Sequence, residues 1–90
     1  MPTVHLTIKG KVQGVFYRAS AKAKAEALGI TGWVKNTEEG NVEAMVTGKQ
    51  DELDEFIAWC RKGPSKARVT NVDVDDRPEK PFHQFSIERS

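Results

Sequence analysis

The chain has 90 residues, which leaves room for one hydrophobic core, so we expect a single domain over residues 1–90. Its 14 basic and 13 acidic residues give a formal net charge of +1, which argues against a general nucleic-acid-binding protein. There is no secretory signal pattern and no apolar run near the roughly 20 residues of a membrane span, and the one cysteine forms no internal disulfide, so we expect a cytoplasmic protein.

The first third of the chain predicts a strand, a glycine-containing loop and a helix. Apolar and polar residues alternate over Thr3–Lys9, which is typical of a half-buried strand. Gly10–Gly14 interrupts this pattern, and from Tyr17 to Leu28 the apolar residues recur at helical spacing. Gly29 then stands where a left-handed residue commonly ends a helix.

The remainder predicts four strands and a second helix. That helix has acidic residues in its first turn, basic residues in its last turn, and one apolar stripe. In chain order we expect a strand at Trp33–Lys35, a turn at Asn36–Asn41, a strand at Val42–Val46, the helix at Asp51–Lys62, and strands at Thr70–Val74 and His83–Ile87. The order is βαββαβ with a further strand appended. Right-handed crossovers place both helices on one face of a mainly antiparallel sheet.

The loop Gly10–Arg18 has the composition of an anion-binding site. Its two glycines let the backbone turn its N–H groups into one concavity, and the helix that follows contributes a positive dipole end. Arg18 offers a planar fork of donors that matches two oxygens of a phosphate. Residues 1–25 carry five basic and no acidic side chains, which favours a small anion, although chance clustering explains the charge equally well. The loop lacks both nucleotide-binding patterns, and a purely structural turn stays open as an alternative.

Asn36 stands at the end of a predicted strand, just before a turn. An asparagine in this position usually satisfies its own backbone, so alone it indicates only a turn.

Two segments together resemble the acylphosphatase family. They are Gly10–Arg18, which reads GKVQGVFYR, and Gly32–Val42, which reads GWVKNTEEGNV. The resemblance covers nearly the whole chain. It implies an α/β (α+β) fold, a ferredoxin-like βαββαβ sandwich, and hydrolysis of small acyl phosphates to a carboxylate and inorganic phosphate. The chain departs from animal members in lacking a closing tyrosine, which leaves open whether its C-terminus contacts the loop.

The resemblance also assigns roles to individual residues. Arg18 would bind the phosphoryl group together with backbone N–H groups of the loop, and Asn36 would hold the attacking water, with Thr37 supporting that geometry. The loop residues concerned are Gln13, Gly14, Val15, Phe16, Tyr17 and Arg18. We expect no metal, no cofactor, no nucleic-acid or membrane partner, and a monomer. No residues indicate a large pocket for the acyl group, which predicts loose selectivity.

Three other interpretations were weighed. An RNA-recognition module shares the βαββαβ order, but it needs aromatic residues on the outward faces of its first and third strands. The outward positions here are His5, Thr7, Lys9, Glu43, Met45 and Thr47, none of them aromatic. A sensor that binds an anion without hydrolysing it has no need of Asn36. A detached piece of a larger maturation enzyme is disfavoured by the clean termini. His5 and His83 are interpreted as structural or exposed residues, and Cys60 as a residue that fills the core.

Overall fold

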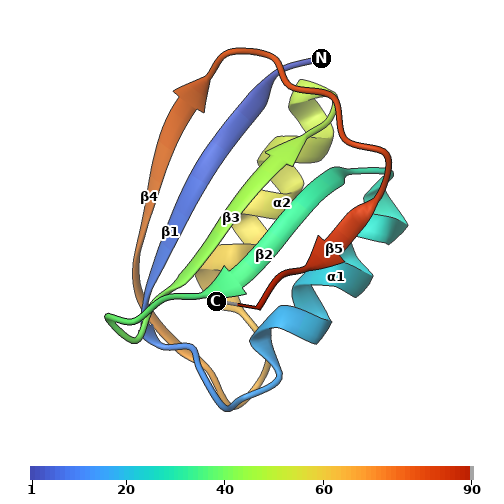
Figure 1. The fold of residues 1–90 in the computed structure, drawn as a ribbon. Helices are drawn as coiled ribbons and strands as arrows, with labels where there is room; N and C mark the ends of the chain where they lie inside the picture. The colour runs from blue at the N-terminus through green and yellow to red at the C-terminus, as the bar shows by residue number, and fades with distance from the viewer. Residues whose placement is uncertain (90) are drawn as a thin grey trace.

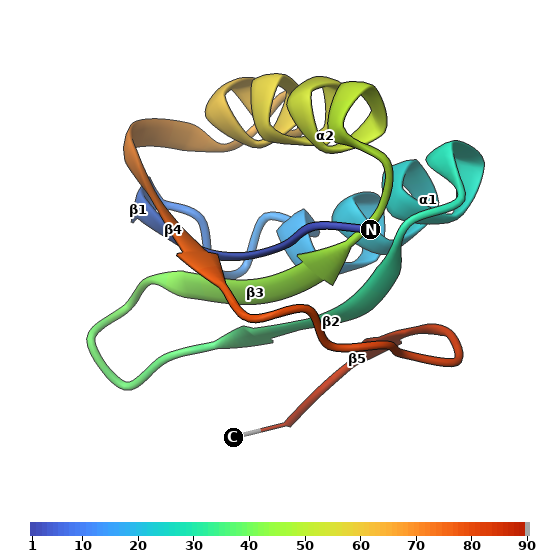
Figure 2. The same cartoon turned by 90° about the horizontal axis from the view of Figure 1, so that it is seen from above.

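Two helices cover one face of a five-stranded sheet in the computed structural model, which describes residues 1–89 (Figures 1 and 2). The elements are β1 (Thr3–Lys11), α1 (Tyr17–Leu28), β2 (Thr31–Asn36), β3 (Val42–Thr47), α2 (Gln50–Lys62), β4 (Arg68–Arg77) and β5 (Phe85–Ile87). The strand order is β4-β1-β3-β2-β5, and only the β2–β5 pair is parallel. The predicted ferredoxin-like fold is confirmed. None of the helices within residues 1–89 has the length and apolarity needed to cross a membrane.

Strand β1 continues two residues beyond the predicted end at Lys9. Its pairing with β4 shifts register between Lys9 and Gly10, which marks a bulge, and then continues to Lys11. Gly10 has φ +122°, and a Cβ there would lie 2.1 Å from the backbone oxygen of Arg68. Only glycine fits this bulge, so what the sequence indicated as the start of a loop is the last part of a strand.

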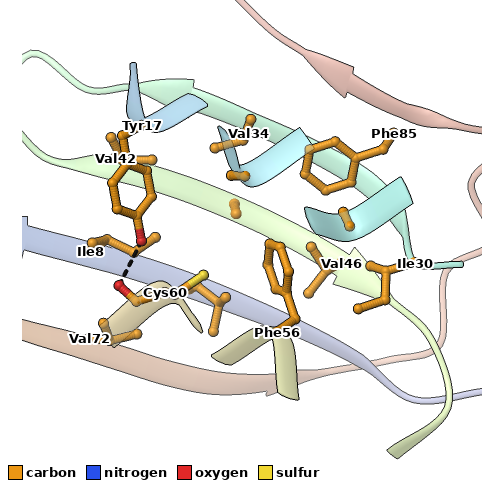
Figure 3. Close-up of a cluster of buried hydrophobic side chains, with 14 of the residues drawn as sticks. Ile8, Tyr17, Ile30, Val34, Val42, Val46, Phe56, Cys60, Val72 and Phe85 are labelled. Carbon is orange, nitrogen blue, oxygen red and sulfur yellow. Dashed lines mark hydrogen bonds between the residues drawn. The ribbon is translucent and has the colours of Figure 1, made fainter. Parts of the chain in front are cut away.

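The core lies between the helices and the inner face of the sheet (Figure 3). Helix α1 buries Tyr17, Ala21 and Ala25, and α2 buries Leu53, Phe56 and Cys60, as the helical spacing predicted. Both predicted helix ends are confirmed, with Gly29 left-handed after α1 and Gly63 directly after α2.

Tyr17 joins the two helices. Its buried hydroxyl donates a 2.7 Å hydrogen bond to the backbone oxygen of Cys60 (Figure 3). That oxygen belongs to the last turn of α2, where carbonyls have no partner within the helix. The bond therefore satisfies an α2 carbonyl while holding the first residue of α1 in place.

The outer face of the sheet carries polar side chains, as predicted for His5, Thr7 and Glu43. His5 Nε2 lies 2.8 Å from Glu43 Oε2, and Lys35 Nζ lies 3.4 Å from Glu43 Oε1. Partial burial opposes ionisation of Glu43, but its hydrogen bonds to His5 and Lys35 prevail and lower its pKa.

Thr47 shares the outer face with Glu43, as predicted, but unlike Glu43 it is buried there. The chain after β4 crosses the outer face at this point (Figure 2), and the Thr47 hydroxyl donates a 2.7 Å hydrogen bond to the backbone oxygen of Lys80. Its Oγ1 also lies 2.7 Å from Thr3 Oγ1. The alternating pattern of β3 does not reveal this contact, because it is made by a segment 33 positions later in the chain.

Burial of Cys60 predicts a loss of stability at alkaline pH. Burial raises the pKa of the Cys60 thiol from 9.0 to about 12, so the unfolded chain releases this proton near pH 9 and the folded chain keeps it until about pH 12. Stability contributed by the neutral thiol is therefore complete below pH 9 and is lost as the pH rises toward 12. Burial raises the pKa of Tyr17 as well, which adds to the same trend.

Urea unfolding at pH 8 and pH 11 measures this effect. We expect the loss of unfolding free energy between the two pH values to be smaller in Cys60→Ala than in the natural chain, by about 2 kcal/mol. Equal losses in both proteins would show that the thiol does not contribute.

Candidate active site

Three strand ends and the start of a helix meet at one end of the sheet. Strands β1 and β2 are both antiparallel to β3 and therefore run in the same direction, and β5 is parallel to β2. Their C-terminal ends consequently lie at the same edge. Figure 1 shows the connection from β1 to α1, the tip of β2 and the segment that follows β5 gathered there.

The loop after β1 turns through two left-handed residues before α1 begins. Gly14 has φ +74° and Phe16 has φ +62°. The first intrahelical bond of α1 runs from the N–H of Ser20 to the backbone oxygen of Phe16, at 3.1 Å. The N–H groups of the three residues before Ser20 consequently precede the helical ladder, and across this described segment no side chain caps them and no acidic residue stands in the first turn. This end of α1 is a suitable environment for an anion.

A pocket of about 420 Å³ opens at this end of the molecule. It is lined by residues from the loop, the first turn of α1, the end of β2 and the C-terminal segment: Val12, Gly14, Phe16, Tyr17, Arg18, Ala19, Asn36, Ile87 and Arg89. The structure thus brings Arg18 and Asn36 to one cavity, although they lie 18 positions apart in the sequence.

Asn36 reaches the pocket because of its position on β2. Side chains alternate along a strand, so Asn36 shares with the buried Val34 the face that α1 covers. Its Oδ1 is buried and, among the described residues, has no hydrogen-bond partner. A buried acceptor left in this way is available to a group that enters the pocket.

Gln13 and Val15 do not line the pocket, in contrast to the other predicted loop residues. Val15 is buried in the core. The Gln13 side chain instead crosses to the β2–β3 turn, where Nε2 donates to the backbone oxygens of Thr37 at 2.9 Å and of Asn41 at 2.7 Å. Gln13 therefore ties the loop that carries Arg18 to the turn that follows Asn36.

Thr37 closes that turn. Its N–H donates to the backbone oxygen of Asn41 at 2.9 Å, and the N–H of Asn41 donates back to Thr37 Oγ1 at 3.1 Å. This reciprocal pair shapes the backbone immediately after Asn36, without placing Thr37 in the pocket.

Ile87 and Arg89 are pocket residues that the sequence interpretation did not include. They reach it because β5 pairs with β2, with Val34 opposite Ile87, and the N–H of Glu88 donates to the backbone oxygen of Val34 at 2.8 Å. The segment from β5 to Arg89 thus lines the same pocket as the loop. The only sequence signal was the short alternating pattern that ends at Ile87.

Comparison with known proteins is consistent with this geometry. Residues 4–87 match the family model described as Acylphosphatase. The chain belongs to the acylphosphatase family. An acylphosphatase from Methylococcus capsulatus is 53% identical over 74 residues, which cover 82% of this chain and 80% of that protein. The resemblance inferred from the two motifs is confirmed.

Solved acylphosphatase structures extend the likeness to the whole fold. The acylphosphatase from Coxiella burnetii has a TM-score of 0.93 at 39% identity, covering 97% of this chain and 92% of that one. The acylphosphatase from Bacillus subtilis has a TM-score of 0.94 at 31% identity, covering 98% and 99%. The chain is accordingly a hydrolase of the acylphosphatase family. Within residues 1–89, no three side chains among His, Cys, Asp and Glu gather into a metal-binding group.

Replacement of Gln13 tests its link between the loop and the turn. Gln13→Met keeps the length of the side chain and removes both donors, so we expect the free energy of unfolding to fall by about 1–2 kcal/mol, the net worth of two hydrogen bonds. Gln84→Met, at an exposed glutamine, is the matched control and is expected to change stability little. Equal unfolding free energies for the two variants in urea would contradict the link.

Proposed function

We propose that the chain hydrolyses the carboxyl–phosphate bond of small acyl phosphates, without a metal, by in-line attack of a water that Asn36 positions on a phosphoryl group held by Arg18 and loop N–H groups. The observation that carries this proposal is that Arg18, the start of α1 and Asn36 line one cavity, and that the buried Oδ1 of Asn36 has no hydrogen-bond partner within residues 1–89. Membership in the acylphosphatase family supports the same reaction.

The phosphoryl group would sit against the start of α1. Its oxygens carry negative charge, which spreads over the three equatorial oxygens in the transition state. The guanidinium of Arg18 is cationic and the N–H groups at the helix start are positively polarised donors; Arg18 lines the pocket, and the backbone of α1 fixes the direction of the N–H groups. Donors arranged in advance stabilise developing charge without reorganising during the reaction.

Asn36 would supply position rather than basicity. Its buried Oδ1 accepts a hydrogen bond from the attacking water and so fixes the water beside the phosphorus. A neutral amide takes up no proton, so we infer that the proton of the water passes to a phosphate oxygen of the substrate. A pH profile showing one essential enzyme base near neutrality would contradict this inference.

The leaving group explains how so few side chains suffice. A carboxylate departs readily without protonation, whereas the alkoxide of an ordinary phosphate ester needs a general acid. The proposed groups therefore serve an acyl phosphate and not an ester. Phosphate release from benzoyl phosphate in the presence of EDTA, with p-nitrophenyl phosphate as the ester control, is the direct test. Activity on benzoyl phosphate alone supports the proposal, and activity on neither substrate supports an anion sensor.

Replacement of Asn36 separates turnover from binding. Asn36→Ala removes the amide that orients water, so we expect kcat to fall by about 100-fold or more while inorganic phosphate still inhibits at a similar concentration. Asn71→Ala, at an exposed asparagine on β4, is the control and is expected to retain kcat. Near-full activity in Asn36→Ala would show that the water is held elsewhere.

Replacement of Arg18 has a different signature. Arg18→Ala removes the side chain that neutralises the phosphoryl oxygens in both the ground state and the transition state. We expect kcat/KM to fall by about 1,000-fold and inhibition by inorganic phosphate to weaken strongly. Arg77→Ala, at an exposed arginine at the end of β4 that pairs with Thr3, removes a positive charge at the opposite end of β1 from the loop and controls for net charge. An Arg18→Ala variant that phosphate inhibits normally would contradict the proposed role.

A further inference from the structure

Phe16 combines a left-handed backbone with an exposed aromatic ring. Its φ of +62° makes it the one residue other than glycine with positive φ among residues 1–89, and its exposed fraction is 77%. Bulky side chains rarely adopt this backbone conformation, which glycine or asparagine occupies at lower cost. The loop therefore requires the conformation but not the phenylalanine.

The ring of Phe16 contributes little to folding. The core begins at its neighbours, since Val15 and Tyr17 are both buried, while the ring between them faces outward. Folding therefore does not explain why an exposed aromatic side chain stands at a position that disfavours it. Phe16 lines the pocket, so a role in ligand binding is the alternative explanation.

A second exposed apolar side chain lines the same pocket. Ile87 is 38% exposed and is held there by the pairing of β5 with β2. The large exposed apolar side chains among the described residues are Met1, Phe16, Val74 and Ile87, so two of these four border one cavity. The lining of the cavity thus combines the cationic side chains of Arg18 and Arg89 with the exposed apolar side chains of Phe16 and Ile87.

The volume of the cavity exceeds what the reacting group needs. A cavity needs only about 10–15 Å³ of this kind of volume to hold one water, so a phosphoryl group and one water fill only a fraction of about 420 Å³. The remaining space is available to the acyl group of the substrate.

We propose that Phe16 and Ile87 form a binding subsite for the acyl group, and that the substrate class it favours is acyl phosphates with a planar, aromatic acyl group. This inference rests on the proposed hydrolysis at Arg18 and Asn36. The ring of Phe16 offers a face or an edge for aromatic contact, and Ile87 adds apolar surface to the lining of the same pocket. Arg89 also lines the pocket and is positively charged. The alternative substrate class is therefore acyl phosphates whose acyl group carries a second carboxylate.

The test compares two substrates in four proteins. The value of kcat/KM is measured for benzoyl phosphate and for acetyl phosphate, and their ratio is taken within each protein, so that the intrinsic reactivity of each substrate cancels between proteins. Phe16→Asn removes the ring while retaining a residue that tolerates the left-handed conformation. Phe16→Tyr keeps the ring, and Val74→Ala removes an exposed apolar side chain outside the pocket.

We expect the benzoyl-to-acetyl ratio to fall by about 3- to 10-fold in Phe16→Asn, the size of one aromatic contact. The ratio should return in Phe16→Tyr and stay unchanged in Val74→Ala. An unchanged ratio in Phe16→Asn, with kcat/KM also unchanged for both substrates, overturns the proposed subsite. An equal fall of kcat/KM for both substrates overturns it too, because Phe16 would then act only through the phosphate-binding loop. A higher kcat/KM of the natural chain for succinyl phosphate than for benzoyl phosphate overturns the preference for aromatic acyl groups. It would show instead that Arg89 selects acyl groups with a second carboxylate.

Failure of this inference is distinguishable from failure of the proposed function. If the natural chain releases phosphate from neither acyl phosphate, the proposed hydrolysis itself is wrong. If it hydrolyses both and the ratio is insensitive to Phe16, hydrolysis stands and only the acyl subsite is overturned.

Discussion

The direction in which β1 and β2 run on either side of β3 is the constraint on which the pocket depends. Both are antiparallel to β3, so both end at the same edge of the sheet, and the crossover between them places the start of α1 there. This arrangement brings Arg18 and Asn36 to the same pocket. A connection that reversed either strand would send one of the two residues to the opposite edge, about a strand length away.

In the loop before α1, some residues hold the structure together and their neighbours have the proposed functional roles. Tyr17 is buried and bonded to the last turn of α2, which anchors the start of α1, and Gln13 is bonded to the β2–β3 turn. Between them the backbone of Phe16 adopts a left-handed conformation and its ring stays exposed. Strained positions persist only where the surrounding structure over-determines them, and these two anchors provide that restraint.

Much of the fold was predictable because local chemistry decides it. The helical spacing from Tyr17, the stop at Gly29 and the apolar stripe of α2 each reflect short-range rules, and all three are confirmed. The bulge at Gly10 was missed, since it depends on the close approach of Arg68 from the far end of the chain. The same reason applies to Thr47, which the segment at Lys80 covers.

By itself, the sequence determined the elements, the family and the two motif residues Arg18 and Asn36, because turn chemistry, periodicity and motif spacing are local properties of the chain. Tertiary structure alone decided which groups share the cavity. The Gln13 side chain turned away to hold a distant turn, and the parallel pairing of β5 brought Ile87 and Arg89 to the loop. The hydrogen bonds of Gln13 join residues 24 and 28 positions apart, and the pocket combines residues from near both ends of the chain. Local patterns do not encode such long-range neighbours, which depend on how the elements pack.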